Sequence, residues 1–128
     1  MKCYIYEIGY LRGRLLENEG KLEEALKMYR ESLEYDPKHY ELRKAIGRTQ
    51  RLLGYHSESI KTFEDFLKNL PTSASRNFEI AKSYYADGNR KKALEHLEIV
   101  LNVWENADAT YKPAIEAREK WIEWNQPN

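Results

Sequence analysis

The 128-residue sequence predicts an all-α fold, a solenoid of three helix–turn–helix repeats followed by a terminal helix. The first observation is that residue types recur every 34 positions, which is typical of repeat proteins. The second is that apolar residues inside one period follow the i, i+3, i+4, i+7 spacing of an amphipathic helix. The recurring columns are Gly13, Gly47 and Ala81; Gly20, Gly54 and Gly88; Ala25, Ser59 and Ala93; and Tyr29, Phe63 and Leu97.

Residues that start and stop helices divide each period into two helices. The column of Gly20 falls where a first helix should end, because glycine tolerates the left-handed conformation of a C-terminal cap. Ser57 and Asn89 are predicted N-caps of the second helices, and Pro37 and Pro71 follow the ends of two of them. These signals predict helices at residues 5–18, 22–34, 39–53, 57–69, 74–87 and 91–104.

The small columns predict close approach between paired helices, because helix axes come within 8–10 Å only where the side chains at the crossing are small. A glycine inside a helix costs about 1 kcal/mol relative to alanine. Gly13 and Gly47 therefore imply a compensating contact, and the column of Tyr29 is expected to fill the space toward the neighbouring repeat.

After Asp108 the pattern changes to a single helix, predicted at about 109–125, that covers the last repeat. Asp108 or Thr110 is its expected cap, and Pro113 lies in its first turn. Trp121 is expected in the core, whereas Trp124 could lie in the core or serve as an exposed anchor. The expected buried face consists of Tyr111, Ala114, Ile115, Arg118, Trp121 and Ile122.

These columns resemble the tetratricopeptide-repeat (TPR) family, which combines small residues, a Gly, an aromatic and a Pro in a 34-residue pattern. Counting from Tyr6, Tyr40 and Ala74 gives repeats 6–39, 40–73 and 74–107 within a single domain, 1–128. The third repeat departs most, with Glu105 in place of proline. The resemblance implies a right-handed α-solenoid with a C-terminal capping helix, and a non-catalytic scaffold that binds other proteins.

Composition excludes several other classes of function. The 21 basic and 21 acidic residues balance, which argues against nucleic-acid binding because that requires a positive excess. No apolar run approaches the ~20 residues of a membrane span, and the single Cys3 suits a reducing compartment, so a cytoplasmic protein is expected. The three histidines are isolated from other ligand types. We therefore expect no metal site, no cofactor and no catalytic residue.

The resemblance implies that the first helix of each repeat lines a concave groove. Arg14, Arg48 and Lys82 recur there at the 34-residue period and are expected to form a ladder that binds an acidic peptide. The alternative is that these cations only pair with Glu17, Glu41 and Glu79 across the repeats. The resemblance would put the chaperone-tail clamp of other TPR domains at Tyr10, Arg14, Ala45, Ser75 and Glu79. Only Arg14 is chemically suitable, so that mode is not expected. The predicted groove residues are Tyr10, Arg14, Glu17, Lys44, Arg48, Arg51, Phe78, Lys82 and Tyr85.

Two alternatives remain open at this level. The apolar segment that begins almost at Met1, with Tyr4 and Ile8, leaves an uncovered N-terminal edge through which copies of the chain could form a homo-oligomer. The sequence is equally compatible with a regulatory segment of a larger multidomain protein.

Overall fold

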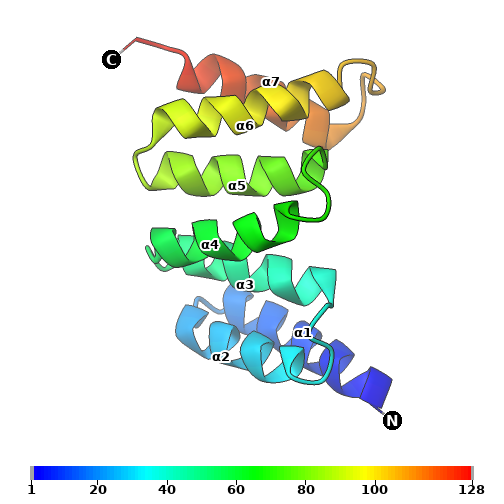
Figure 1. Cartoon of the computed structure of the whole chain (residues 1–128). Helices are drawn as coiled ribbons and strands as arrows, with labels where there is room; N and C mark the ends of the chain where they lie inside the picture. The colour runs from blue at the N-terminus through cyan, green and yellow to red at the C-terminus, as the bar shows by residue number, and fades with distance from the viewer. Residues whose placement is uncertain (1, 128) are drawn as a thin grey trace. The chain divides into compact units, whose positions relative to one another are not determined.

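A computed structural model describes the backbone of residues 2–127 and the side chains of residues 7–127. Within these residues there are seven α-helices and no strand, which confirms the all-α prediction (Figure 1). The six repeat helices lie within a few residues of their predicted positions. The helices are α1 (Lys2–Asn18), α2 (Leu22–Leu33), α3 (Tyr40–Leu52), α4 (His56–Leu67), α5 (Ala74–Ala86), α6 (Arg90–Val103) and α7 (Lys112–Trp124).

The chain forms two compact units, Met1–Thr62 and Phe63–Asn128. In the first unit α1 packs on α2 and α2 packs on α3. In the second unit α5 packs on α6 and α6 packs on α7.

Each pair of repeat helices is joined by a turn in which glycine has a positive φ. Gly20, Gly54 and Gly88 have φ values of 79°, 87° and 84°, as their position at the predicted helix ends requires. The turn closes when the amide of Lys21 donates a 2.8 Å hydrogen bond to the carbonyl of Leu16. Such left-handed caps satisfy carbonyls at the end of a helix that have no partner within it.

Close packing of α1 on α2 depends on glycine. A Cβ atom added to Gly13 would lie 2.2 Å from Cε1 of Tyr29, and one added to Gly9 would lie 1.6 Å from Oγ of Ser32. Neither distance is compatible with non-bonded atoms. The α1–α2 contact therefore compensates the intrinsic helix penalty of these two glycines, which the small columns predicted for Gly13 but not for Gly9.

The first unit has a core formed by α2 and α3, in which Ala25, Leu26, Tyr29, Leu42 and Ala45 are buried. A hydrogen bond adds to the contact between α3 and α4, because the Oγ of the buried Ser59 donates to the carbonyl of Gly47 at 2.7 Å. A serine replaces alanine in this column and satisfies its hydroxyl within the core.

In the second unit the equivalent alanine, Ala93, and Leu97 are fully buried. Asn77 is also buried, and its amide nitrogen donates to the carbonyls of Pro71 and Ser73, each at 2.9 Å. Its Oδ1 lies 2.8 Å from Nδ1 of His96. His96 therefore forms a hydrogen bond that links α6 to α5.

Two predicted N-caps are wrong. Ser57 lies inside α4, which already begins at His56. At α7 the N-cap is Tyr111, which makes no side-chain cap bond, while Pro113 lies in the first turn as predicted. Asp108 instead accepts hydrogen bonds from the amide and hydroxyl of Thr110, at 2.8 and 2.7 Å. The carboxylate is satisfied within that turn, before the helix begins.

The predicted buried face of α7 is also shifted. Ala114, Ala117 and Trp124 are buried, whereas Tyr111 and Ile122 are exposed. Arg118 is exposed, and Trp121 and Ile115 are only half-buried. Arg90 of α6 anchors the end of α7 through hydrogen bonds to the carbonyl oxygens of Trp124 and Gln126. These bonds join the end of α7 to the start of α6.

Candidate functional site

An ion pair joins α1 and α3, the first helices of two successive repeats, and is the central feature of the first unit. The Nη2 of Arg48 in α3 lies 2.6 Å from Oε1 of Glu17 in α1. The hydroxyl of Tyr29 in α2 donates to the same oxygen at 2.5 Å. Three helices thus meet at one carboxylate, and both side chains of the ion pair are largely shielded from solvent.

The surroundings of Glu17 stabilise its charge. Burial alone raises the pKa of Glu17, but hydrogen bonds from Arg48 and Tyr29 and the positive charges of Arg48 and Arg14 outweigh burial and lower the pKa below its ordinary value. Burial and the bond to Glu17 raise the pKa of the Tyr29 phenol, so that it remains a donor. Glu17 is therefore an anion with two arginines around it.

The other predicted residues of this unit lie on α1 and α3. Tyr10, Arg14, Lys44 and Arg51 are all half-buried. Tyr10 is tilted against Tyr29, with ring centroids 6.2 Å apart. The structure therefore brings Tyr10, Glu17 and Arg48 together around Tyr29.

A hollow of about 340 Å³, which we call the α1–α3 hollow, lies beside Tyr10. Glu7, Tyr10, Leu11, His39 and Glu41 line it. His39 is the N-cap of α3, and its Nδ1 accepts from the amide of Leu42 at 3.2 Å. Sequence reasoning did not select Leu11 and His39 for this surface. The place of His39 immediately before a repeat start was the available signal.

In the second unit Lys82 is already engaged. Its Nζ lies 3.0 Å from Oε1 of Glu79, 3.9 Å from Glu116 of α7 and 4.4 Å from the centroid of the Phe78 ring. Tyr85 is exposed and stacks on Trp124 with a centroid distance of 4.5 Å.

Phe78 is placed differently from the other aromatic residues of the predicted groove. Only 4% of its surface is exposed, and its ring packs edge-on against Trp104. Phe78 therefore belongs to the core of the second unit and does not offer a face to a ligand.

The described part of the chain contains neither a cluster of metal ligands nor a helix that could span a membrane. Among residues 7–127, no three His, Cys, Asp or Glu side chains are grouped so that they could hold a metal ion. None of the helices in the described range combines the length and apolar character that a membrane span requires.

Known proteins resemble this chain in sequence and in fold. The family model of the tetratricopeptide repeat matches residues 10–39. The peroxisomal targeting signal receptor of Komagataella phaffii is 33% identical over 93 residues, which is 73% of this chain but only 16% of the receptor. The chain thus corresponds to a small part of that relative.

Solved structures share the fold at low sequence identity. PcrH from Pseudomonas aeruginosa superposes with a TM-score of 0.81 at 15% identity, covering 94% of this chain and 92% of PcrH. YrrB, described as a TPR protein with an unusual peptide-binding site, gives a TM-score of 0.73 at 21% identity, covering 89% of this chain and 57% of YrrB. The helix pairs, the glycine-closed turns, the family match and these neighbours agree, and the chain belongs to the tetratricopeptide-repeat family.

Proposed function

We propose that this chain is a non-catalytic scaffold that binds an acidic segment of a partner protein on the α1–α3 face of its first unit. The observation that carries the proposal is the arrangement of Arg14 and Arg48 around the single carboxylate of Glu17. One anion neutralises only one of the two cations. The cluster therefore keeps a positive excess that a carboxylate of a ligand can neutralise.

Neighbouring groups support an acidic ligand with some apolar character. Lys44 adds a further half-buried cation on α3, and Tyr10 adds a half-buried aromatic ring. Neither Arg14 nor Lys44 has an ion-pair contact among the described residues. A ligand carboxylate could therefore approach them without displacing an existing pair.

Two similar proteins have names that agree with an interaction role. One is a receptor for a peroxisomal targeting signal, and the other is a TPR protein with a peptide-binding site. The ladder of Arg14, Arg48 and Lys82 remains a prediction. Since Lys82 contacts Glu79, a ligand would have to compete with that carboxylate for the third cation.

The test uses a synthetic peptide with aspartate at every third position and leucine between the aspartates, because an extended chain advances about 3.3 Å per residue. A peptide with lysine in place of aspartate is its control. We expect roughly micromolar affinity that weakens as salt rises, because exposed ion pairs contribute only ~0.2–1 kcal/mol each. Fluorescence anisotropy at two salt concentrations measures both properties.

Arg14→Glu should weaken binding of the aspartate peptide by about tenfold or more, because it replaces attraction by repulsion. Lys27→Glu is the matched control, since it makes the same charge change at an exposed position of α2 in the same unit. Equal affinity for the aspartate and lysine peptides, or equal losses in the two variants, would refute the acidic-ligand proposal.

A further inference from the structure

The outer side of α1 is an uncovered apolar stripe. Ile8, Leu11 and Leu15 are 48%, 64% and 60% exposed. Their i, i+3, i+7 spacing puts them on one side of the helix. Arg12 lies among them and is also exposed. We call these four residues the α1 stripe.

The chain itself shows what such a stripe does when a neighbour is present. One repeat later, the positions equivalent to Ile8, Leu11 and Leu15 are Leu42, Ala45 and Thr49, and each of these is fully buried. Leu42 and Ala45 pack in one core with α2, the helix that precedes them. In the repeat pattern, therefore, these columns are contact columns, and at α1 they have no covering helix among the described residues.

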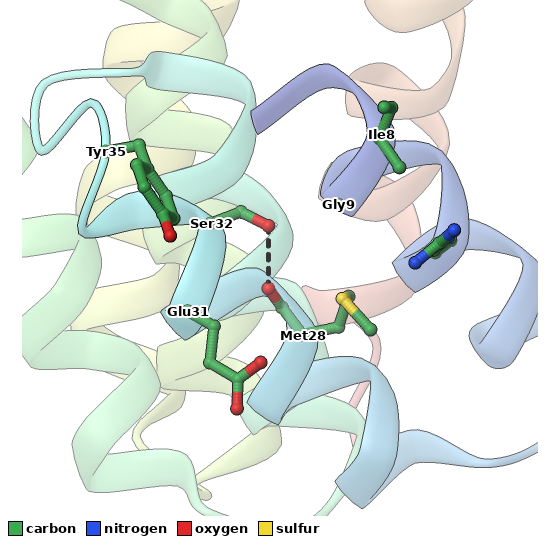
Figure 2. Close-up of a pocket in the computed structure, with 7 residues that line it drawn as sticks. Ile8, Gly9, Met28, Glu31, Ser32 and Tyr35 are labelled. Atoms are coloured by element: carbon green, nitrogen blue, oxygen red, sulfur yellow. Dashed lines mark hydrogen bonds between the residues drawn. The ribbon is translucent and has the colours of Figure 1, made fainter. Parts of the chain in front are cut away.

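Beside the α1 stripe lies a hollow of about 370 Å³ between α1 and α2, which we call the α1–α2 hollow (Figure 2). The Oγ of Ser32 donates to the carbonyl of Met28 at 2.8 Å, so this hydroxyl does not need a ligand. The hollow can accept an apolar side chain without leaving the Ser32 hydroxyl unpaired. Its lining consists of Ile8, Gly9, Arg12, Met28, Glu31, Ser32 and Tyr35.

The charges of the hollow are of opposite sign. Arg12 lies on α1 and Glu31 on α2, and neither has an ion-pair or hydrogen-bond partner among residues 7–127. A surface that carries an apolar stripe, one available cation and one available anion is complementary to itself. That is the requirement for a two-fold interface, in which the same patch occurs on both copies.

We propose that the α1 stripe and the α1–α2 hollow bind a second copy of this chain through a two-fold axis near Leu11. The two α1 helices run antiparallel, and Arg12 of each copy pairs with Glu31 of the other. The surface shares Leu11 with the α1–α3 hollow but contains none of Arg14, Glu17 and Arg48, so the dimer does not depend on the acidic-ligand proposal. An interface built from one such stripe and one hollow on each copy predicts a weak, reversible dimer.

Sedimentation equilibrium over a series of protein concentrations tests the dimer. The expected result is a reversible monomer–dimer equilibrium. Leu11→Glu should abolish the dimer, whereas Leu52→Glu, which changes a leucine of similar exposure (57%) on α3, should leave it intact. Circular dichroism of both variants checks that they remain folded.

Charge reversal tests the two-fold arrangement. Arg12→Glu and Glu31→Arg should each raise the dissociation constant roughly threefold to tenfold, because each creates a like-charge pair. The double variant should have the dissociation constant of the wild type again. In a Cys3→Ser background, Leu11→Cys should form an intermolecular disulfide near the axis, and Leu52→Cys should not.

A monomer at all concentrations would overturn the proposal. Growth beyond the dimer, or dissociation by Ile122→Glu on α7 instead of Leu11→Glu, would indicate a head-to-tail contact and would equally overturn it. Loss of the dimer in both single charge variants without recovery in the double variant would exclude the Arg12–Glu31 pairing.

Discussion

Arg48 donates a hydrogen bond from Nη2 to Oε1 of Glu17, a residue 31 positions earlier in the chain, at a distance of 2.6 Å. The bond joins the first helices of two successive repeats. Because Tyr29 donates to the same oxygen, the three side chains form a single network. This network both shapes the proposed binding face and holds α1, α2 and α3 together.

Removal of Arg48 should therefore reduce stability as well as binding. Arg48→Met leaves Glu17 with one donor fewer in a shielded environment, and we expect the free energy of unfolding to fall by about 1–3 kcal/mol. Arg14→Met, which removes a neighbouring cation without breaking the ion pair, should change it by less than about 0.5 kcal/mol. Urea denaturation measures both. Equal stabilities of the two variants would mean that the Arg48–Glu17 pair does not contribute to the free energy of unfolding.

The lowered pKa of Glu17 predicts a specific loss of stability in acid. A carboxyl group whose pKa is lower in the folded state stabilises the fold above its unfolded pKa, and loses that contribution as the pH falls through the folded pKa. The loss should begin below about pH 4.5, the ordinary value for this group. Thermal melting between pH 6 and pH 3 should show a smaller acid-induced decrease for Glu17→Gln than for the wild type. Parallel pH profiles would contradict the assignment.

Gly13→Ala should destabilise the protein although alanine is the better helix former by about 1 kcal/mol. The new Cβ would lie 2.2 Å from the Tyr29 ring, and overpacking of this kind typically costs about 1–3 kcal/mol. Lys27→Ala at an exposed position of α2 serves as the control, with an effect within about 0.5 kcal/mol. A Gly13→Ala variant that melts above the wild type would show that propensity outweighs packing here.

Deletion of residues 110–128 should destabilise the second unit. The deletion removes Trp124, which is buried and stacks on Tyr85, and it removes the buried alanines of α7. The end of a repeat array needs a covering element, so we expect fraying of α6 and aggregation. Light scattering during a thermal melt measures both effects. A truncated chain that stays monodisperse and melts like the full chain would exclude a capping role for α7.

The sequence by itself determined the helices and their turns. The 34-residue columns, together with Gly20, Gly54 and Gly88, placed the six repeat helices and identified the fold class. These features are local: helix periodicity and a left-handed cap depend on residues a few positions apart. The columns of small residues also predicted which sites lie between helices, because Gly13 and Ala25 can be read only as close contacts.

Only the tertiary structure decided which charged and aromatic groups are already engaged. The pairing of Arg48 with Glu17 depends on how α1 and α3 approach and on side-chain rotamers, neither of which periodicity reports. Phe78 occupies a predicted groove position, yet it is buried because Trp104 packs against its ring. In α7 apolar residues lie on more than one side, so spacing did not determine whether Ile122 or Trp124 faces the core. In the structure Trp124 is the buried residue, and its ring stacks on Tyr85 of α5.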